Sequence, residues 1–116
     1  MIPGYREHYF IEDCHNVEIE NLKSGRIPND IYAEIHKGIV IPTHDAVINY
    51  DNKGIVLVER SGSPLKGYLW LPGGKISRGI PTKDSLIARV FDECGIEIKD
   101  LEFAGAERAF MPTDPL

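Results

Sequence analysis

The pattern of hydrophobic and polar positions predicts a short helix over residues 28–38. Ile31 and Ile35 stand four positions apart, so they share one face of an amphipathic helix. An Asn-Asp pair at the start of the segment supplies capping side chains, and Gly38 can end the helix. We therefore expect about three helical turns before the first strands.

A second and longer helix is predicted from about Lys83 to Cys94. Thr82 is a natural N-cap, Asp84 places negative charge in the first turn, and Gly95 is a natural C-terminal stop. The apolar and polar positions separate onto two faces. Leu86, Ile87, Val90, Phe91 and Cys94 form one face, and Ser85, Arg89, Asp92 and Glu93 form the other.

Four runs rich in β-branched and aromatic residues predict strands. Residues 46–50 and 54–60 flank a turn-forming Asp-Asn-Lys-Gly segment, which favours a hairpin. Residues 68–71 form another strand that ends at Pro72-Gly73-Gly74, and residues 101–106 suggest one more. We expect Tyr68 and Trp70 to pack in the core.

Helices that alternate with strands predict an α/β or α+β domain with a mixed sheet. Residues 28–116 form this domain, and residues 1–27 form an N-terminal extension with a possible short hairpin. The chain ends directly after the last predicted strand, so the sheet is expected to be incomplete at its C-terminal side. Because an incomplete sheet leaves an exposed edge, we expect a homodimer.

Composition narrows the function. The chain has 116 residues, 42% of them hydrophobic and 27% charged, which is ordinary for one soluble globular domain. The formal net charge of −5 disfavours a general nucleic-acid binder. Two cysteines supply no disulfide framework, and the charged N-terminus lacks a secretory signal. Apolar runs are too short to cross a membrane, so a cytoplasmic protein is expected.

The residues that carry chemistry lie between Leu71 and Ile96. The Gly73-Gly74 pair follows a strand, where glycine lets the backbone turn sharply and approach a ligand closely. Carboxylates on the next helix, at Asp92 and Glu93, can hold a hard cation. A cation between carboxylates and a diphosphate neutralises charge and polarises the leaving group.

This segment resembles the Nudix box, a motif with the pattern G-x5-E-x7-R-E-U-x-E-E-x-G-U. In this pattern x is any residue and U is a bulky apolar residue. Gly74, Val90, Asp92, Glu93 and Gly95 match without a gap. The pattern fails at three positions, where the upstream acid, the arginine and the following acid are replaced by Ile80, Ala88 and Arg89.

The reduced box is similar to that of GDP-mannose mannosyl hydrolases, and the likeness extends over roughly residues 30–110. It implies an Nudix-like α/β/α sandwich and a Mg²⁺ (or Mn²⁺) ion held by Glu93, Asp92 and the Gly74 carbonyl. It implies that Arg60 and Asp45 contact the diphosphate and leaving group, that Arg60 is catalytic, and that Tyr32 lies near the base. The general base of those enzymes is a later histidine, which would fall beyond residue 116.

Simpler interpretations remain open for each residue. Arg89 with Asp92 and Glu93 can form surface ion pairs, and the glycine pair alone can be a turn. Arg60 can be a solvated strand end, and Asp45 can belong to a strand-edge turn. Cys14 and His15 fit no zinc spacing and are expected to be incidental, and Cys94 is expected in the core.

Two functions follow from this interpretation. The first is a Mg²⁺-dependent hydrolase of a nucleoside diphosphate derivative, with a sugar nucleotide such as GDP-mannose as the leading substrate. The second is a catalytically impaired Nudix-like module that binds a nucleotide, which the missing acids at Ile80 and Arg89 favour. Neither requires nucleic acid or a membrane.

Overall fold

The computed structural model describes residues 4–7, 23, 25–62 and 65–110. It confirms the α+β class. The elements, in chain order, are α1 (Asn29–Gly38), β1 (Thr43–Asp45), β2 (Val58–Glu59), β3 (Leu69–Trp70), β4 (Gly73–Lys75) and α2 (Thr82–Cys94). The hairpin expected within residues 1–27, together with Cys14 and His15, lies outside the described residues.

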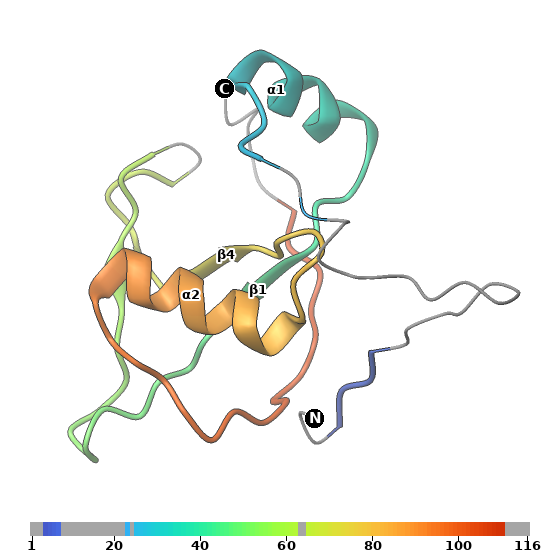
Figure 1. Cartoon of the computed structure of the whole chain (residues 1–116). Helices are drawn as coiled ribbons and strands as arrows, with labels where there is room; N and C mark the ends of the chain where they lie inside the picture. The colour runs from blue at the N-terminus through green and yellow to red at the C-terminus, as the bar shows by residue number, and fades with distance from the viewer. Residues whose placement is uncertain (1–3, 8–22, 24, 63–64, 111–116) are drawn as a thin grey trace, which may run out of the picture.

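The centre of the molecule is the β1–β4 pair with α2 across it (Figure 1). The two strands are antiparallel, and Thr43 pairs with Lys75 while Asp45 pairs with Gly73. Backbone bonds extend the pair at both ends, from Ala46 N–H to the Pro72 carbonyl and from Ile76 N–H to the Pro42 carbonyl. The glycine pair was expected as a turn, and here it is instead part of a paired strand.

The second sheet pairs β2 with β3, also antiparallel. The turn of the hairpin predicted between residues 46–50 and 54–60 is present, and Asp51 and Asn52 adopt positive φ there. Its strands are shorter than predicted, and an isolated bridge between Asn49 and Ile55 joins them near the turn. The strand expected at 101–106 is wrong, since the described residues there form no regular element.

Helix α1 confirms the prediction for residues 28–38, but its capping differs. Pro28 occupies the N-cap position, no side chain caps the first turn, and the helix runs through Gly38 to a C-cap at Ile39. No described residue of α1 is buried, and the helix lies apart from α2 (Figure 1).

Helix α2 begins one residue earlier than expected. Thr82 is its first residue and Pro81 takes the N-cap position, so the predicted Thr82 cap is wrong. The Thr82 amide donates to the Glu7 carboxylate and its hydroxyl bonds with Tyr5, which ties the helix to the N-terminal segment. At the other end Gly95 is left-handed as predicted, with φ 70°.

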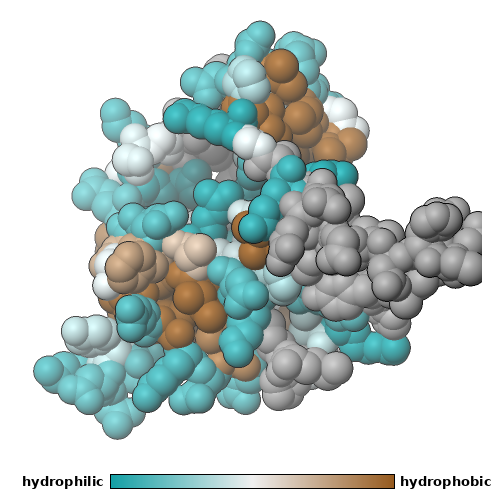
Figure 2. Space-filling view, viewed as in Figure 1, coloured by the Kyte–Doolittle hydropathy of each residue, from teal (hydrophilic) through white to brown (hydrophobic). Residues whose placement is uncertain are grey.

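The core is small. Within the described residues the buried hydrophobic side chains are Ala46 and Val90, joined by Pro72 and Ser85. Tyr68 is 64% exposed, so its predicted core position is wrong. Apolar side chains gather on the visible surface over α1 and around α2 (Figure 2). No helix among the described residues is long and apolar enough to cross a membrane.

Candidate functional site

Three side chains on one face of α2 form hydrogen bonds with the backbone of β4 and of the residues directly after it. These residues form a row four positions apart on the helix, and the backbone positions they contact are two apart. Four helical residues rise roughly 6 Å and two extended residues roughly 7 Å, so the two repeats stay in step. The contacts are Glu93 with Gly73, Arg89 with Lys75, and Ser85 with Ser77.

Gly73 allows β4 to lie close against β1. A Cβ atom built on Gly73 would collide with the His44 carbonyl oxygen and lie 2.7 Å from both Cα and Oδ1 of Asp45. Its φ of 152° also lies in the region that side chains rarely adopt. Gly74 shares a positive φ but has open space around it. The close approach at Gly73 is therefore one of strand to strand, and the predicted approach of the glycine pair to a ligand stays a prediction.

Carboxylates meet around Gly73 and form what we call the acidic end, defined by Asp45, Glu93 and Glu107. The Gly73 N–H donates to Oε2 of Glu93 over 3.3 Å. The pKa of Asp45 is raised, chiefly by partial burial, and further by the charges of Glu107 and Glu93. The charges of His44 and Arg60 oppose this rise in pKa. Glu107, Glu93 and Arg60 therefore all act electrostatically on Asp45.

The structure places Arg60 directly after β2. Its guanidinium carbon lies 5.6 Å from the centre of the Trp70 ring, a cation–π distance. Its amide donates to the Tyr68 carbonyl. Because Arg60 lowers the pKa of Asp45, its charge acts at the acidic end.

The predicted metal ligands Asp92, Glu93 and the Gly74 carbonyl stay a prediction. Asp92 is exposed, and within the described residues it forms no hydrogen bond or ion pair with a side chain. Among the described residues no three histidine, cysteine, aspartate or glutamate side chains are grouped closely enough to hold a metal ion.

Arg89 does not form the surface ion pairs that were left open for it. Its Nε donates to the Lys75 carbonyl oxygen over 3.1 Å, and Nη2 donates to the Ser77 hydroxyl over 3.4 Å. Both acceptors are neutral, so these bonds fix the guanidinium without cancelling its charge. The ion-pair interpretation of Arg89 is therefore wrong.

A buried polar network lies between the two strands and α2. Ser85 is 1% exposed, and its Oγ accepts from the Ser77 N–H over 3.0 Å. The same Oγ lies 2.8 Å from Nε2 of His44. Burial lowers the pKa of His44, and the charge of Arg89 lowers it further. A neutral His44 can then accept a hydrogen bond at Nε2 from the Ser85 hydroxyl.

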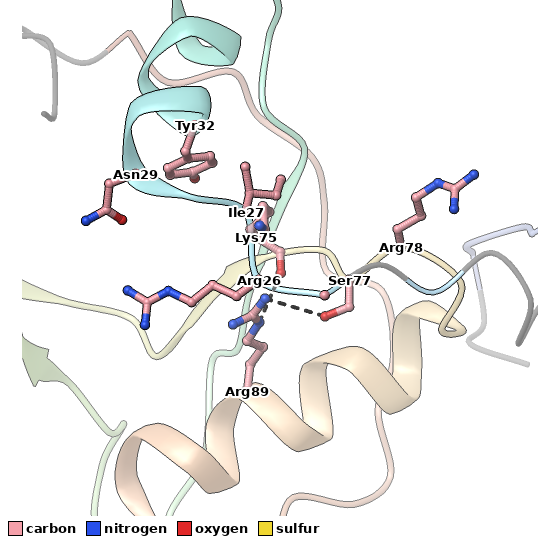
Figure 3. Close-up of a pocket in the computed structure, with 9 residues that line it drawn as sticks. Arg26, Ile27, Asn29, Tyr32, Lys75, Ser77, Arg78 and Arg89 are labelled. Atoms are coloured by element: carbon pink, nitrogen blue, oxygen red, sulfur yellow. Dashed lines mark hydrogen bonds between the residues drawn. The ribbon is translucent and has the colours of Figure 1, made fainter.

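Tyr32 lies away from the acidic end. Lys75 Nζ lies 5.0 Å from the Tyr32 ring centre, and the ring meets His36 edge-on. Tyr32 lines a cavity of about 530 Å³ between the start of α1 and the β4–α2 layer (Figure 3). The other residues that line it are Gly25, Arg26, Ile27, Asn29, Lys75, Ser77, Arg78 and Arg89.

Several of these residues were not predicted as functional. Lys75 and Ser77 lie directly after the glycine pair, where alternation along an extended segment offered the only signal. Ser85 was assigned to the polar face of the helix, and it is buried because that face lies on the chain that follows β4. Glu107 had no signal, since it lies outside the regular elements.

Comparison with known proteins adds one relative. The chain is 31% identical over 62 residues to an ADP-ribose pyrophosphatase of Methanocaldococcus jannaschii. The match covers 53% of this chain and 34% of that protein, so the chain spans about a third of its relative's length. No protein-family model and no solved structure matches the chain.

Proposed function

We propose that this protein is a Nudix-type hydrolase that acts on a nucleoside diphosphate derivative. Two observations on the sequence support the proposal. The sequence from Gly74 to Ile96 resembles a reduced Nudix box, and the chain is similar to an ADP-ribose pyrophosphatase. ADP-ribose and GDP-mannose are both sugars joined to a nucleoside diphosphate, so the two observations agree on the substrate class and differ on the particular substrate.

The observation that carries the proposal is the acidic end at Gly73. Glu93 reaches the Gly73 amide across 20 residues of sequence, and Asp45 lies opposite Gly73 on β1. Partial burial raises the pKa of Asp45, and the charges of Glu107 and Glu93 raise it further, so a cation bound there would favour the charged carboxylate. This is the electrostatic setting in which a diphosphate binds together with a metal ion.

The residues present can bind Mg²⁺ together with a phosphate of the substrate. Mg²⁺ is commonly held by one or two carboxylates, water and the oxygens of a substrate phosphate. Glu93 and Asp45 can supply carboxylates, and the Gly74 carbonyl and Asp92 are further candidates. When bound, the ion would neutralise charge on the diphosphate. A cage of protein ligands alone does not fit, because the described residues bring no three such side chains together.

Arg60 is the proposed phosphate-binding and catalytic cation. Its guanidinium lies over Trp70 and its charge acts on Asp45, and arginine binds phosphate oxygens through paired N–H donors. Negative charge that develops on the departing nucleoside diphosphate would be stabilised there. Asp45 would contact the leaving group. The position of Tyr32 beside Lys75 gives no support to its predicted contact with the base.

The dimer and the cytoplasmic location belong to the same proposal. The β2–β3 sheet has two strands, and Leu69 and Tyr68 are more than 60% exposed along it. A second copy that pairs with this sheet would cover them. Light scattering at working concentration tests this directly, and a monomer would contradict it.

A second function is favoured by a specific observation. Arg89 replaces the acid that follows the arginine in the Nudix box, and its guanidinium is bonded to the Lys75 carbonyl and to Ser77. A site that lacks this acid, and also lacks the upstream glutamate that Ile80 replaces, can retain nucleotide binding without turnover. A nucleotide-binding module is therefore the alternative.

Calorimetric titration separates these possibilities. ADP-ribose, GDP-mannose and GDP are titrated with and without Mg²⁺ into wild type and Glu93→Gln, with Glu97→Gln as a control that removes one exposed acid outside the site. Glutamine keeps an acceptor for the Gly73 amide, so the fold is preserved. We expect Mg²⁺-dependent binding that weakens about tenfold or more in Glu93→Gln alone.

Product analysis on the same samples then distinguishes hydrolase from binding module. Release of a nucleoside mono- or diphosphate in the presence of Mg²⁺ supports the enzyme. Binding without product supports the module. If neither sugar nucleotide binds with Mg²⁺, the proposed function is wrong.

A further inference from the structure

The cavity beside the first turn of α1 has a lining that the overall composition does not explain. The chain carries a formal charge of −5. Four of the nine residues that line this cavity are nevertheless basic, and none of the described lining residues is acidic. Like charges gathered in one cavity repel one another unless an anion lies between them. We call this space the basic cavity, defined by Arg26, Tyr32, Lys75, Ser77 and Arg89.

The basic groups come from three separate segments. Arg26 precedes α1, Lys75 ends β4, and Arg89 lies in the middle of α2 (Figure 3). In the close-up the Arg89 guanidinium rises from α2 toward Lys75 and Ser77, whereas the Arg78 guanidinium is directed away from them (Figure 3).

Arg89 is held in a fixed orientation. Its bonds to the Lys75 carbonyl and the Ser77 hydroxyl use two of its five N–H donors. The Ser77 hydroxyl accepts from Arg89 and keeps its own proton to donate, while the Ser77 amide is fixed by Ser85. Lys75 is steadied over the Tyr32 ring at 5.0 Å. Donors positioned in this way lose little side-chain entropy when they bind a ligand.

We propose that the basic cavity binds the phosphate group of a phosphorylated small molecule without a bound metal ion. Arg89 and Lys75 contact the phosphate oxygens, Ser77 donates a hydroxyl bond, and Arg26 adds positive charge to the lining. Arginine offers the paired donors that a phosphate accepts, and lysine acts as a point charge. A volume of about 530 Å³ is in the range of small-molecule sites.

The phosphate can come from a free anion or from a nucleotide. Its binding does not depend on hydrolysis or on the acidic end, so the two proposals can fail separately. The basic cavity is tested in EDTA, where a site that needs Mg²⁺ is inactive. The probes are orthophosphate, pyrophosphate and ADP-ribose, each measured by calorimetry at low and at high salt.

Three variants remove one positive charge each from the cavity: Arg26→Gln, Lys75→Gln and Arg89→Gln. Lys53→Gln is the matched control, because Lys53 lies in the hairpin turn beside Asp51 and outside the cavity. Arg89 also holds the backbone near Lys75, so circular dichroism checks its fold. Arg26 and Lys75 make no such backbone bond and keep the test valid if the Arg89 variant unfolds.

We expect pyrophosphate to bind in EDTA and to weaken as salt rises. Lys75→Gln and Arg89→Gln should each reduce the affinity about tenfold or more, and Arg26→Gln less, with Lys53→Gln unchanged. If pyrophosphate binds more tightly than ADP-ribose, the natural ligand is a free anion. If ADP-ribose binds more tightly, the ligand is a nucleotide. The proposal is overturned if no probe binds in EDTA at low salt, or if Lys53→Gln weakens binding as much as Lys75→Gln.

Discussion

The two ends of β4 are built in the same way and carry opposite charge. At Gly73 the helix contributes Glu93, and Asp45 and Glu107 add further negative charge. At Lys75, two residues along the strand, the helix contributes Arg89, and Lys75 and Arg26 add positive charge. The same helix row on one extended segment thus presents an acidic and a basic region roughly 7 Å apart.

His44 lies between the two regions and responds to both. The positive charge of Arg89 lowers its pKa, and the negative charge of Asp45 raises it. Under the proposals made above, Glu93 serves the metal-dependent site and Arg89 serves the separate basic cavity, so an acid is needed at position 93 and a base at position 89.

The largest expected effect comes from adding a methyl group at Gly73, where β4 lies close against β1. In Gly73→Ala the new methyl group collides with the β1 backbone and the residue keeps a strained φ. Overpacking and backbone strain each cost about 1–3 kcal/mol, so we expect the free energy of unfolding to fall by about 3 kcal/mol or more.

Gly74→Ala is the matched control for this prediction. Its φ of 148° is equally unfavourable, but nothing lies within 4 Å of the added Cβ. Only the backbone strain remains, so the loss should be about half as large. Urea denaturation measures both variants, and equal losses would show that strand contact at Gly73 is not the cause.

A smaller effect is expected from Ser85→Ala in the buried polar network between the strands and α2. The change removes the acceptor of the Ser77 amide and the partner of His44 Nε2, both partly buried. An unsatisfied buried group costs about 1–3 kcal/mol. Urea denaturation should show this loss, while the exposed Ser61→Ala should show none. An unchanged free energy of unfolding in Ser85→Ala would mean that the network does not hold the segment after β4 to the helix.

The apolar face of each helix, together with residues expected at its ends, predicted both helices. Gly95 ends α2 in a left-handed conformation as its sequence position indicated. The N-terminal caps were wrong, since prolines at positions 28 and 81 already set an extended backbone ahead of each helix. Strand lengths were also wrong, because a strand forms only where a partner lies alongside it, and local β-propensity does not reveal the partner.

The site was predictable only in part, for a related reason. The one-dimensional pattern indicated that Glu93 and the glycine pair belong together, and the structure places them in contact. It did not indicate that Arg89 would contact the backbone near Lys75, because that contact depends on how the helix row lies along β4. The cavity at Tyr32 depends on three segments that are distant in sequence, so no local motif could reveal it.

The smallest effect tests whether the acidic end is electrostatically strained. The pKa of Asp45 is raised by burial and by two neighbouring acids, so its protonated form is favoured in the folded protein. Stability from this group is therefore complete below the ordinary pKa of 3.8 and is lost as the pH rises through the raised value. Asp45→Asn imitates the protonated form and should be the more stable protein at neutral pH, by less than about 1 kcal/mol because solvent screens the charge.

Thermal unfolding of both proteins across pH checks this sign. The advantage of Asp45→Asn should shrink as the pH falls, because Asp45 then becomes protonated itself. Asp51→Asn is the control, since Asp51 is exposed beside Lys53 and should show no such gain. If Mg²⁺ binds where we propose, adding it at neutral pH should also reduce the advantage, because the ion stabilises the charged carboxylate. A variant less stable than wild type at neutral pH would show that His44 and Arg60 outweigh the burial and repulsion at Asp45.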